Sequence, residues 1–365
     1  MYNPIMTSGV KRFGILTSGG DAPGLNSAIR AVCRTAMIQY GMEPIGIKNG
    51  YRGLVENKCF TITADDISGI LTRGGTVLGT SRDKPFKNPE PDPETGLLPV
   101  EAIKKTYKEW NMDAIVCIGG NGTNTTASQL ADEGLNVIGL PKTIDNDIVK
   151  TDITFGFHTA LDVATEAVDR IHTTAHSHSR IMVIEVMGHK AGWLGLYSGI
   201  AGGADVILLP EIPYDIDSVA NCIMKRRDAG KEFSIVVVAE GALSIDEALL
   251  QKKELKKRRK LMPYSIAYRV AHELEEATGL ISRVTVLGYL QRGGTPSSYD
   301  RILASQFGAA AAHFLAKGQF GNLVALQNNK IVPVPLKEVA GQVKNIPVDH
   351  DMIAAGRGLG TCFGD

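Results

Sequence analysis

Two aspartates and a threonine alternate within one short stretch, PKTIDND, which spans Pro141–Asp147. If this stretch is extended, Thr143, Asp145 and Asp147 point to the same face. Two carboxylates on one face allow a division of labour, because one can accept a proton from a hydroxyl while the other helps to hold Mg²⁺. The alternative interpretation is an Asx-rich turn that only caps the local structure.

Two glycine-rich turns would supply phosphate sites beside these carboxylates. SGGDAPG (Ser18–Gly24) and GGNGT (Gly119–Thr123) each follow an apolar run and lead into a predicted helix. Glycine lets backbone N–H groups approach an anion, and a helix N-terminus adds about half a positive charge. Arg82, in GTSRD, is suited to clamping phosphate oxygens. The sequence has no GxxxxGK[ST] motif, which excludes a P-loop kinase.

Three further arginines, Arg180, Arg283 and Arg292, flank or end predicted strands. Guanidinium groups bind phosphate oxygens in a bidentate manner. Each arginine alone is typical of a solvated surface residue, whereas the three together indicate an anion site such as one for a sugar phosphate.

The elements that must position these residues alternate along the chain. Short Val- and Ile-rich runs, typical of strands buried on both faces, each end in a glycine or a polar turn. They are Phe13–Thr17, Pro44–Ile47, Ala114–Ile118, Val137–Leu140, Ile181–Val186, Val206–Leu209, Ser234–Ala239 and Val284–Leu290. Predicted helices between them include Asn26–Tyr40, Asn124–Glu133, Ala160–Thr173, Ser218–Ala229 and Ile302–Lys317. This alternation predicts a doubly wound α/β fold with ligands at the carboxyl ends of the strands.

Size and composition set the broad class. A chain of 365 residues suggests two domains. Its 39 Lys+Arg balance 39 Asp+Glu, which argues against general nucleic-acid binding. No apolar run is long enough to cross a membrane, and MYNPIMTSGV lacks the apolar core of a signal peptide. The five cysteines form no disulfide framework or CxxC pair. We therefore expect a cytoplasmic protein.

Together, the motifs resemble those of the 6-phosphofructokinase family. SGGDAPGLNSAIR, GGTVLGTSR, IGGNGT, PKTIDND, EVMGHKAGWL, IAGGAD, VAEG and TVLGYLQRGGTPSSYDRILAS follow the family's order between about Gly14 and Asn328. The resemblance implies Mg²⁺-dependent phosphoryl transfer to the 1-hydroxyl of fructose 6-phosphate in glycolysis. It also implies two similar doubly wound, Rossmann-like domains with the active site in the cleft between them. We expect a donor-binding domain at 1–157 plus 277–325 and a sugar-binding domain at 158–276 plus 326–365.

The resemblance assigns roles position by position. Asp145 matches the general base, with Thr143, Asp147 and Arg180 completing the catalytic set. Asn121 and Asp147 match the Mg²⁺ positions, although many members carry an aspartate where this chain has Asn121. The expected donor-binding residues are Gly20, Arg82, Gly119, Gly120, Gly122, Thr123 and Lys142.

The sugar site implied by the resemblance draws on the same segment and on later motifs. Its expected residues are Thr143, Ile144, Asp145, Arg180, Met187, Gly188, His189, Glu240, Arg283, Tyr289, Leu290, Gln291 and Arg292. In the family, the counterparts of Arg180 and Arg283 reach the sugar phosphate of a neighbouring subunit. The resemblance therefore implies a homotetramer or homodimer.

Two positions bear on the phosphoryl donor. Gly122 matches ATP users, in which glycine leaves space for the α-phosphate, whereas pyrophosphate users carry an aspartate there. Lys142 matches pyrophosphate users, since ATP users of the common bacterial type have glycine. The chain thus resembles the family's mixed-substrate group. We expect ATP as the donor, because a missing carboxylate opens the site and a flexible lysine can coexist with ATP; pyrophosphate is the alternative.

Four other interpretations are open. His172, His176 and His178 could indicate a zinc site, although no supporting Cys or carboxylate is suitably spaced. A dinucleotide-binding module would need GxGxxG after the first strand, where the chain reads SGGDAPG. The basic run Gln251–Lys260 is either a solvated helix face or a partner contact. The runner-up is a related kinase for another sugar or a nucleoside, but the MGH and RGG motifs favour fructose 6-phosphate.

Overall fold

A computed structural model describes residues 9–87, 89–261 and 265–365. The signal-peptide argument concerns residues 1–10, of which 1–8 lie outside the described residues. The described residues form two compact units. The first unit comprises the residues up to Ile144, Ile148–Thr159 and Arg292–Val343, and the second comprises Asp145–Asp147, Ala160–Gln291 and Lys344–Asp365.

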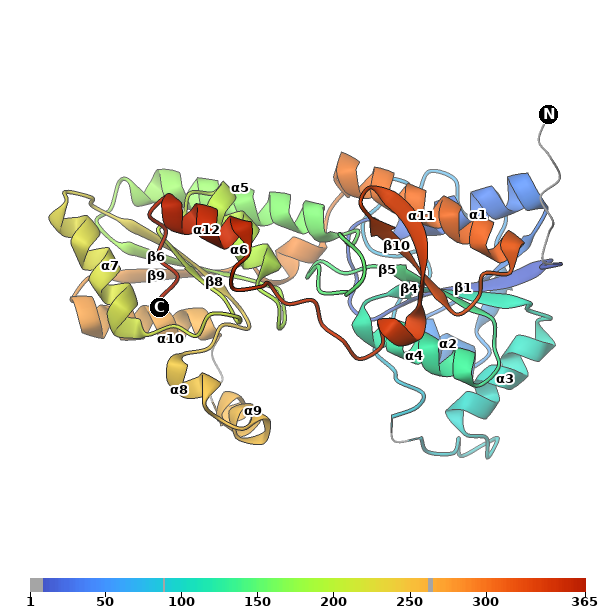
Figure 1. The fold of residues 1–365 in the computed structure, drawn as a ribbon. Coiled ribbons are helices and arrows are strands. Elements are labelled where there is room, and N and C mark those ends of the chain that lie inside the picture. Colours follow the sequence, from blue (N-terminus) through green and yellow to red (C-terminus); the bar gives the residue numbers. More distant parts are fainter. Residues whose placement is uncertain (1–8, 88, 262–264) are drawn as a thin grey trace. The chain divides into compact units, whose positions relative to one another are not determined.

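The first unit is built on a seven-stranded sheet in the order β11-β10-β5-β4-β1-β2-β3 (Figure 1). The inner strands run parallel, whereas β3 and β11 add antiparallel edges. The strands are β1 (Arg12–Ser18), β2 (Glu43–Ile47), β3 (Cys59–Thr61), β4 (Ala114–Gly119), β5 (Val137–Pro141), β10 (Asn322–Gln327) and β11 (Lys330–Pro335). The helices are α1 (Leu25–Tyr40), α2 (Gly50–Val55), α3 (Pro99–Glu109), α4 (Asn121–Asp132), α11 (Ser298–Lys317) and the 3₁₀ turn η2 (Leu336–Glu338).

Helices cover both faces of this sheet. On one face, Ile29 and Val32 of α1 and Phe307 of α11 are fully buried in a core that includes Ile15 and Val116. The opposite core contains residues of α2, α3 and α4, among them Tyr51, Leu54, Ile103 and Leu130. Two apolar faces explain why these strands are continuous Val and Ile runs rather than alternating ones.

The second unit has a four-stranded, wholly parallel sheet in the order β7-β8-β6-β9. Its strands are β6 (Ile181–Val186), β7 (Val206–Leu208), β8 (Ser234–Ala239) and β9 (Ser282–Val286). Its helices are α5 (Phe157–Ala175, which starts in the first unit), α6 (Trp193–Ala201), α7 (Ile216–Asp228), α8 (Ile245–Ala248), α9 (Lys252–Leu261), α10 (Ile266–Thr278), α12 (Asp351–Gly358) and the 3₁₀ turn η1 (Gly288–Arg292). One core holds α7 and α10 against β6 and β8, while α6 packs on β7 and β8 from the other face.

The doubly wound α/β class is confirmed, and three details differ from the sequence prediction. Strand β9 ends at Val286, not Leu290, because Gly288 has φ +48° and the chain turns into η1. Strand β9 pairs with β6 in the second unit, and β10 and β11 join the first sheet. The units therefore divide near residues 291 and 343, whereas the predicted domain boundaries fall at 277 and 325.

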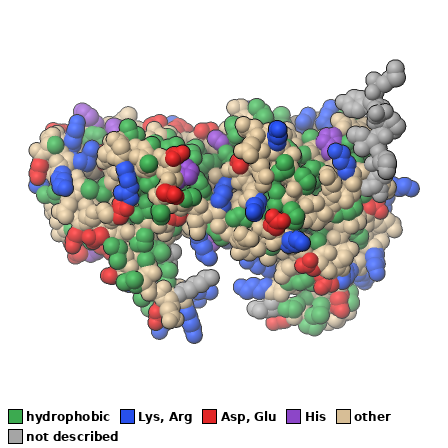
Figure 2. Space-filling view, in the orientation of Figure 1, with side chains coloured by type: hydrophobic (Ala, Val, Ile, Leu, Met, Phe, Trp, Pro, Cys, Tyr) green, Lys and Arg blue, Asp and Glu red, His purple; other side chains and the backbone are tan. Residues whose placement is uncertain are grey.

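The remaining segments lie at the surface. Lys84–Pro99 is a segment rich in proline and acidic residues. Its described residues are predominantly exposed and form no strand. Residues 266–276 form most of α10, and residues 262–264 lie outside the described residues. The basic run forms α9, which carries surface Lys and Arg side chains (Figure 2), including exposed Lys253, Lys256, Lys257 and Lys260. Among the described residues, no helix is long and apolar enough to cross a membrane.

Candidate functional site

Three loops meet at the carboxyl edge of the first sheet. Strands β1, β4 and β5 are neighbours, with Ser18 paired to Gly119 and Gly119 paired to Pro141. The first glycine loop, the second glycine loop and the PKTIDND segment therefore leave the sheet at adjacent positions. Parallel strands place their carboxyl ends at one edge, which is where this class of fold binds ligands.

The first loop is fixed by the GTSRD stretch. The Gly19 amide donates to the Ser81 carbonyl (2.8 Å), and the Thr80 hydroxyl donates to the Gly19 carbonyl (2.6 Å). Gly19 has φ +88°, a conformation that favours glycine. Arg82 directly follows Ser81, the residue that contacts this loop, and Arg82 is exposed.

The second loop opens helix α4, with Gly120 at its N-cap. A Cβ atom on Gly119 would lie 2.2 Å from the Thr123 Oγ1 atom, so only glycine allows this close turn. The Asn124 side chain donates to the carbonyls of Gly119 (3.0 Å) and Gly120 (3.1 Å). Because the first amides of a helix lack intrahelical acceptors, the start of α4 at Asn121, Gly122 and Thr123 can bind an anion.

A pocket of about 310 Å³ adjoins the second loop within the first unit. Arg52, Lys84 and Lys87 line it together with Asp83, which pairs with Arg52 at 3.0 Å. A Cβ atom on Gly122 would lie 3.7 Å from the Cε atom of Lys84, so the pocket wall and the helix start are in contact range. Sequence reasoning missed Lys84, although it directly follows the RD of the GTSRD motif.

Lys142 is buried, with 3% of its surface exposed. Its ammonium group donates to the backbone carbonyls of Gly20 and, at 3.4 Å, of Ser18. Its amide donates to the Gly119 carbonyl (3.1 Å). Lys142 therefore joins both glycine loops to the segment that carries the aspartates.

The PKTIDND segment is not the extended strand that the alternation predicted. A bend occurs at Ile144 and Asp145, and Asn146 has φ +50°. The prediction that Thr143, Asp145 and Asp147 share the face of an extended strand is therefore wrong, because a left-handed residue reverses the alternation. Asparagine tolerates this conformation better than most residues.

The turn is buried and held in place. Thr143, Asn146 and Asp147 are each at most 8% exposed, Ile144 is fully buried, and Asp145 is partly exposed. The Thr143 carbonyl accepts from the Thr154 hydroxyl (2.8 Å). At Asp145 the chain passes from the first unit into the second, and it returns at Ile148. The two carboxylates thus belong to the second unit, whereas Lys142 and Thr143 belong to the first.

The second unit brings together five of the predicted sugar-site residues at the carboxyl ends of β6 and β8 and in η1. The His189 amide donates to Glu240 Oε1 (2.7 Å), and the Met187 amide donates to Gln291 Oε1 (3.2 Å). Gly188, between them, has φ +144°. Gln291 is fully buried, whereas its neighbours Tyr289 and Leu290 are 74% and 69% exposed.

Arg180 and Arg283 lie at the opposite edge of the second sheet. Arg180 immediately precedes β6, and Arg283 is the second residue of β9, where it pairs with Met182. The six residues of β6 span about 20 Å, which separates Arg180 from Met187. Within the second unit, Arg180 and Arg283 therefore lie apart from the predicted sugar-site residues around Met187 and Glu240.

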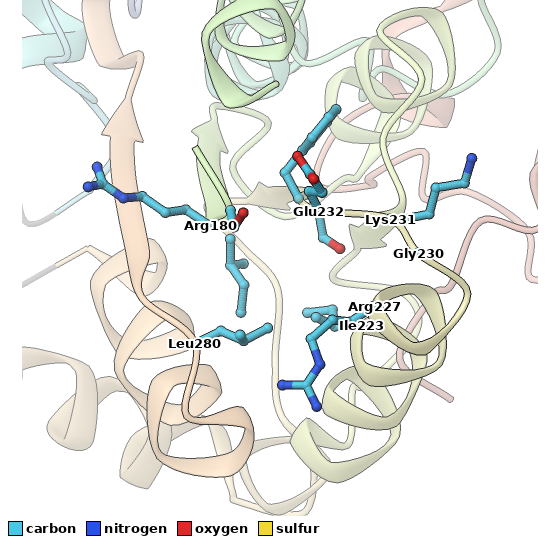
Figure 3. Close-up of a pocket in the computed structure, with 11 residues that line it drawn as sticks. Arg180, Ile223, Arg227, Gly230, Lys231, Glu232 and Leu280 are labelled. Carbon is cyan, nitrogen blue, oxygen red and sulfur yellow. The ribbon is translucent and has the colours of Figure 1, made fainter. Parts of the chain in front are cut away.

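The amino edge contains a pocket of about 340 Å³, shown in Figure 3. Arg227 points into it, whereas the side chains of Arg180 and Lys231 extend away from it; Ile223 and Leu280 also line the pocket. Basic side chains near the end of α7 are favourable because a helix C-terminus carries partial negative charge. This pocket does not include any residue of the glycine loops or the PKTIDND segment.

Arg292 is placed at the first glycine loop in the first unit. Its guanidinium donates to the Asp21 carbonyl (2.9 Å), and a Cβ atom on Gly20 would lie 2.8 Å from Arg292 Nη1. Gly20 therefore makes room for the guanidinium. The predicted sugar-site residue Arg292 thus sits beside a predicted donor-site loop.

The residues predicted to hold Mg²⁺ offer suitable chemistry. Asn121 and Asp147 supply amide and carboxylate oxygens, the hard donors that Mg²⁺ takes. Among the described residues, no three His, Cys, Asp or Glu side chains cluster in a way that would hold a metal. Oxygens of this kind are what Mg²⁺ takes from a protein where substrate phosphates supply its other ligands.

The histidines of the zinc alternative pack around an aromatic ring. The ring centroids of His172 and His176 lie 5.2 and 6.2 Å from that of Phe233. All five cysteines are described, and none forms a disulfide.

Comparisons with known proteins agree with this arrangement. A family profile described as Phosphofructokinase matches residues 12–315. The ATP-dependent 6-phosphofructokinase of Spirochaeta thermophila is 60% identical over 359 residues, covering 97% of this chain and 98% of that protein. The protein of the same name from Propionibacterium freudenreichii is 52% identical, covering 97% and 99%.

Solved structures give the same fold. Pichia pastoris phosphofructokinase in the T-state superposes with a TM-score of 0.79 at 34% identity, over 97% of this chain and 37% of that longer chain. A pyrophosphate-dependent phosphofructokinase from Marinobacter aquaeolei superposes with a TM-score of 0.77 over 98% of this chain. Its 24% identity supports the fold alone.

Proposed function

This chain belongs to the phosphofructokinase family, and we propose that it transfers a phosphoryl group from ATP to the 1-hydroxyl of fructose 6-phosphate. The product is fructose 1,6-bisphosphate, and the reaction is a step of glycolysis. The observation that carries the proposal is the meeting of two glycine loops and the PKTIDND segment at one sheet edge. Relatives of nearly the same length are named ATP-dependent 6-phosphofructokinase.

In the proposed reaction, the first unit binds the phosphoryl donor. The glycine loops and the start of α4 hold the phosphates through backbone amides, and Arg82 and Lys142 supply positive charge. Phosphoryl transfer leaves little covalent work to the protein, so positioning and charge neutralisation provide most of the catalysis. Mg²⁺, held by oxygens of Asn121 or Asp147 and the phosphates, would neutralise charge on the transferred group.

Asp145 acts as the general base. Its carboxylate accepts the proton of the sugar 1-hydroxyl as the hydroxyl attacks the terminal phosphorus of ATP, whose bond to the bridging oxygen breaks so that ADP leaves. Thr143 and Asp147, on either side, orient the phosphate and assist the metal. Partial exposure of Asp145, in contrast to its buried neighbours, is consistent with access for a sugar hydroxyl.

Two features support ATP as the donor. The first is Gly122, because a glycine there leaves the position of an α-phosphate free of a carboxylate. The second is the adjoining pocket of about 310 Å³, which can receive the nucleoside that ATP carries and pyrophosphate lacks. Lys142, the residue typical of pyrophosphate users, contacts carbonyls of the first loop, whereas the atoms within 4 Å of a Cβ atom on Gly122 belong to Lys84.

The donor assay tests this proposal. Purified protein is given fructose 6-phosphate and Mg²⁺ with either ATP or pyrophosphate, and fructose 1,6-bisphosphate is quantified. We expect saturable formation with ATP. Saturable activity with pyrophosphate and none with ATP would reverse the donor assignment, and activity with neither would refute the function. Lys84→Met is expected to raise the KM for ATP while leaving that for fructose 6-phosphate nearly unchanged.

We also propose that the enzyme is a homo-oligomer, a dimer or a tetramer, in the cytoplasm. The separation of Arg180 and Arg283 from Met187 and Glu240 supports a site that a second copy completes. Edge strand β9 and the adjoining η1 expose Val286, Tyr289 and Leu290, as a subunit contact requires. Light scattering during size exclusion would give the mass, and a monomer with full activity would contradict this proposal.

A further inference from the structure

The C-terminal segment that starts at Lys344 contacts the turn between Asp145 and Asp147, and both belong to the second unit. The Lys344 amide donates to the Asp147 carbonyl (2.8 Å). The Lys344 ammonium donates to the side-chain carbonyl of Asn146 (3.1 Å). Asn146 is the left-handed residue between the two aspartates, and it is only 6% exposed. One lysine therefore holds both the backbone and a side chain of the turn that carries the proposed base.

Lys344 is itself tied to the sugar-binding motif. The Trp193 indole N–H donates to the Lys344 carbonyl (2.8 Å), and the Lys344 ammonium lies 5.4 Å from the Trp193 ring centroid. Such a cation–π contact favours one position of the lysine side chain. Trp193 is the first residue of α6 and completes the MGHKAGW motif, four residues after His189.

A partly buried carboxylate, that of Glu211, reinforces this connection. Glu211 Oε1 accepts from the amides of Gly192 (2.9 Å) and Ile346 (3.0 Å). Burial raises the pKa of Glu211. The residue before Trp193 and a residue two positions after Lys344 thus share one acceptor, so the C-terminal segment and the sugar-binding motif are fastened at two points.

From these contacts, we propose that Lys344 is a positioning residue that fixes the Asp145–Asp147 turn relative to the MGHKAGW motif, acting through Asn146. The inference rests on the proposed function, in which the base and the sugar must be aligned. Proton transfer and in-line attack tolerate little displacement, and a shift of about 1 Å costs roughly 10²-fold in rate. No sequence motif marks Lys344, because its partners lie about 150 and 200 residues earlier in the chain.

Lys344→Met removes the ammonium group and keeps the backbone hydrogen bonds. We expect kcat to fall by about 10- to 100-fold, while the KM values for ATP and fructose 6-phosphate change less than about threefold. Lys344→Arg should recover most of the loss, because a guanidinium can donate to the same Asn146 oxygen. Lys337→Met removes an exposed lysine of the first unit and serves as the matched control, with wild-type kinetics expected.

Asn146→Ala provides an independent route if Lys344→Met fails to fold. If Lys344 acts through Asn146, the double variant loses no more activity than the more impaired single variant. Any of three results would overturn the inference. They are a wild-type kcat in folded Lys344→Met, additive losses of activity in the double variant, and a kcat in Lys344→Arg that stays as low as in Lys344→Met.

Hydrogen exchange separates this inference from the proposed function. Lys344→Met should accelerate amide exchange in residues 145–148 relative to wild type and to Lys337→Met. An inactive wild-type protein refutes the enzymatic function and leaves this readout intact. If the wild-type protein is active and Lys344→Met shows unchanged amide exchange in residues 145–148, only the positioning role is refuted.

Discussion

The Lys142 ammonium donates a hydrogen bond to the backbone carbonyl of Gly20, so a buried cation fastens the first glycine loop to the segment after β5. A second donation, to the Ser18 carbonyl at 3.4 Å, comes from the same nitrogen. Lys142, the residue type of pyrophosphate users, thus holds the first glycine loop in place. This role is compatible with ATP as the donor.

Lys142→Met should therefore impair the donor side of the reaction. Without the ammonium group, the Gly20 carbonyl loses its donor and the loop that holds the phosphates loosens. We expect kcat/KM for ATP to fall by about 10- to 100-fold, with a smaller change in the KM for fructose 6-phosphate. Lys108→Met, at an exposed position of α3, is the control. Equal losses in both KM values would contradict a role confined to the donor loop.

Gly122 should set donor choice through the space and charge beside α4. A Cβ atom there meets Lys84 only at 3.7 Å or more, an ordinary contact. Gly122→Ala should therefore keep most of the ATP activity. Gly122→Asp should raise the KM for ATP by at least about tenfold, because a carboxylate repels the α-phosphate. Steady-state kinetics of both variants provide the comparison, and similar values for Ala and Asp would refute the charge argument.

Asp300 should matter for stability. The carboxylate is fully buried and accepts from the amides of Gly156 (2.9 Å) and Thr159 (2.7 Å) and from the Thr159 hydroxyl (2.5 Å). Asp300→Ala leaves these donors without their acceptor, so the first unit should lose about 3 kcal/mol of unfolding free energy. Urea unfolding measures the loss. Asp132→Ala, at an exposed position near the end of α4, should unfold like wild type; a loss below about 1 kcal/mol in Asp300→Ala would contradict the prediction.

Acid should weaken the contact between α1 and α11. Burial, and then the charge of Lys317, lower the pKa of His313, whose Nδ1 lies 2.6 Å from the Tyr40 hydroxyl. The unfolded chain therefore takes up this proton first as the pH falls through roughly 6.5, and folding stability declines from about pH 7.5 downward. His313→Gln keeps a hydrogen-bonding side chain without the titration. The urea midpoint should depend less on pH between 7.5 and 5.5 in this variant, and identical pH dependence would contradict the assignment.

The fold class followed from local signals, because strands buried on both faces must be continuous apolar runs. Phe13–Thr17 and Ala114–Ile118 fall within β1 and β4, and the glycine turns after them became the two loops. The division of the chain into its two units was not predictable from such local signals. The pairing of β9 with β6, and of β10 with β5, is set by long-range contacts that leave no local pattern.

The site was predicted in its residue types more than in its geometry. Alternation at Thr143, Asp145 and Asp147 suggested a strand, but Asn146 adopts a left-handed conformation that one sequence cannot reveal. Arg292, predicted for the sugar, lies against Gly20. Lys344 had no local signal, since its contacts with Trp193 and Asn146 arise only when the C-terminal segment folds back onto the second unit.

The most direct measurement is the turnover of Asp145→Asn. The substitution keeps the size of the side chain and removes its ability to accept a proton. With ATP, Mg²⁺ and fructose 6-phosphate, we expect kcat to fall by at least about 10³-fold, while binding of fructose 6-phosphate by calorimetry changes less than about threefold. Turnover close to that of wild type in the purified, folded variant would contradict the central claim that Asp145 is the base of the phosphoryl transfer.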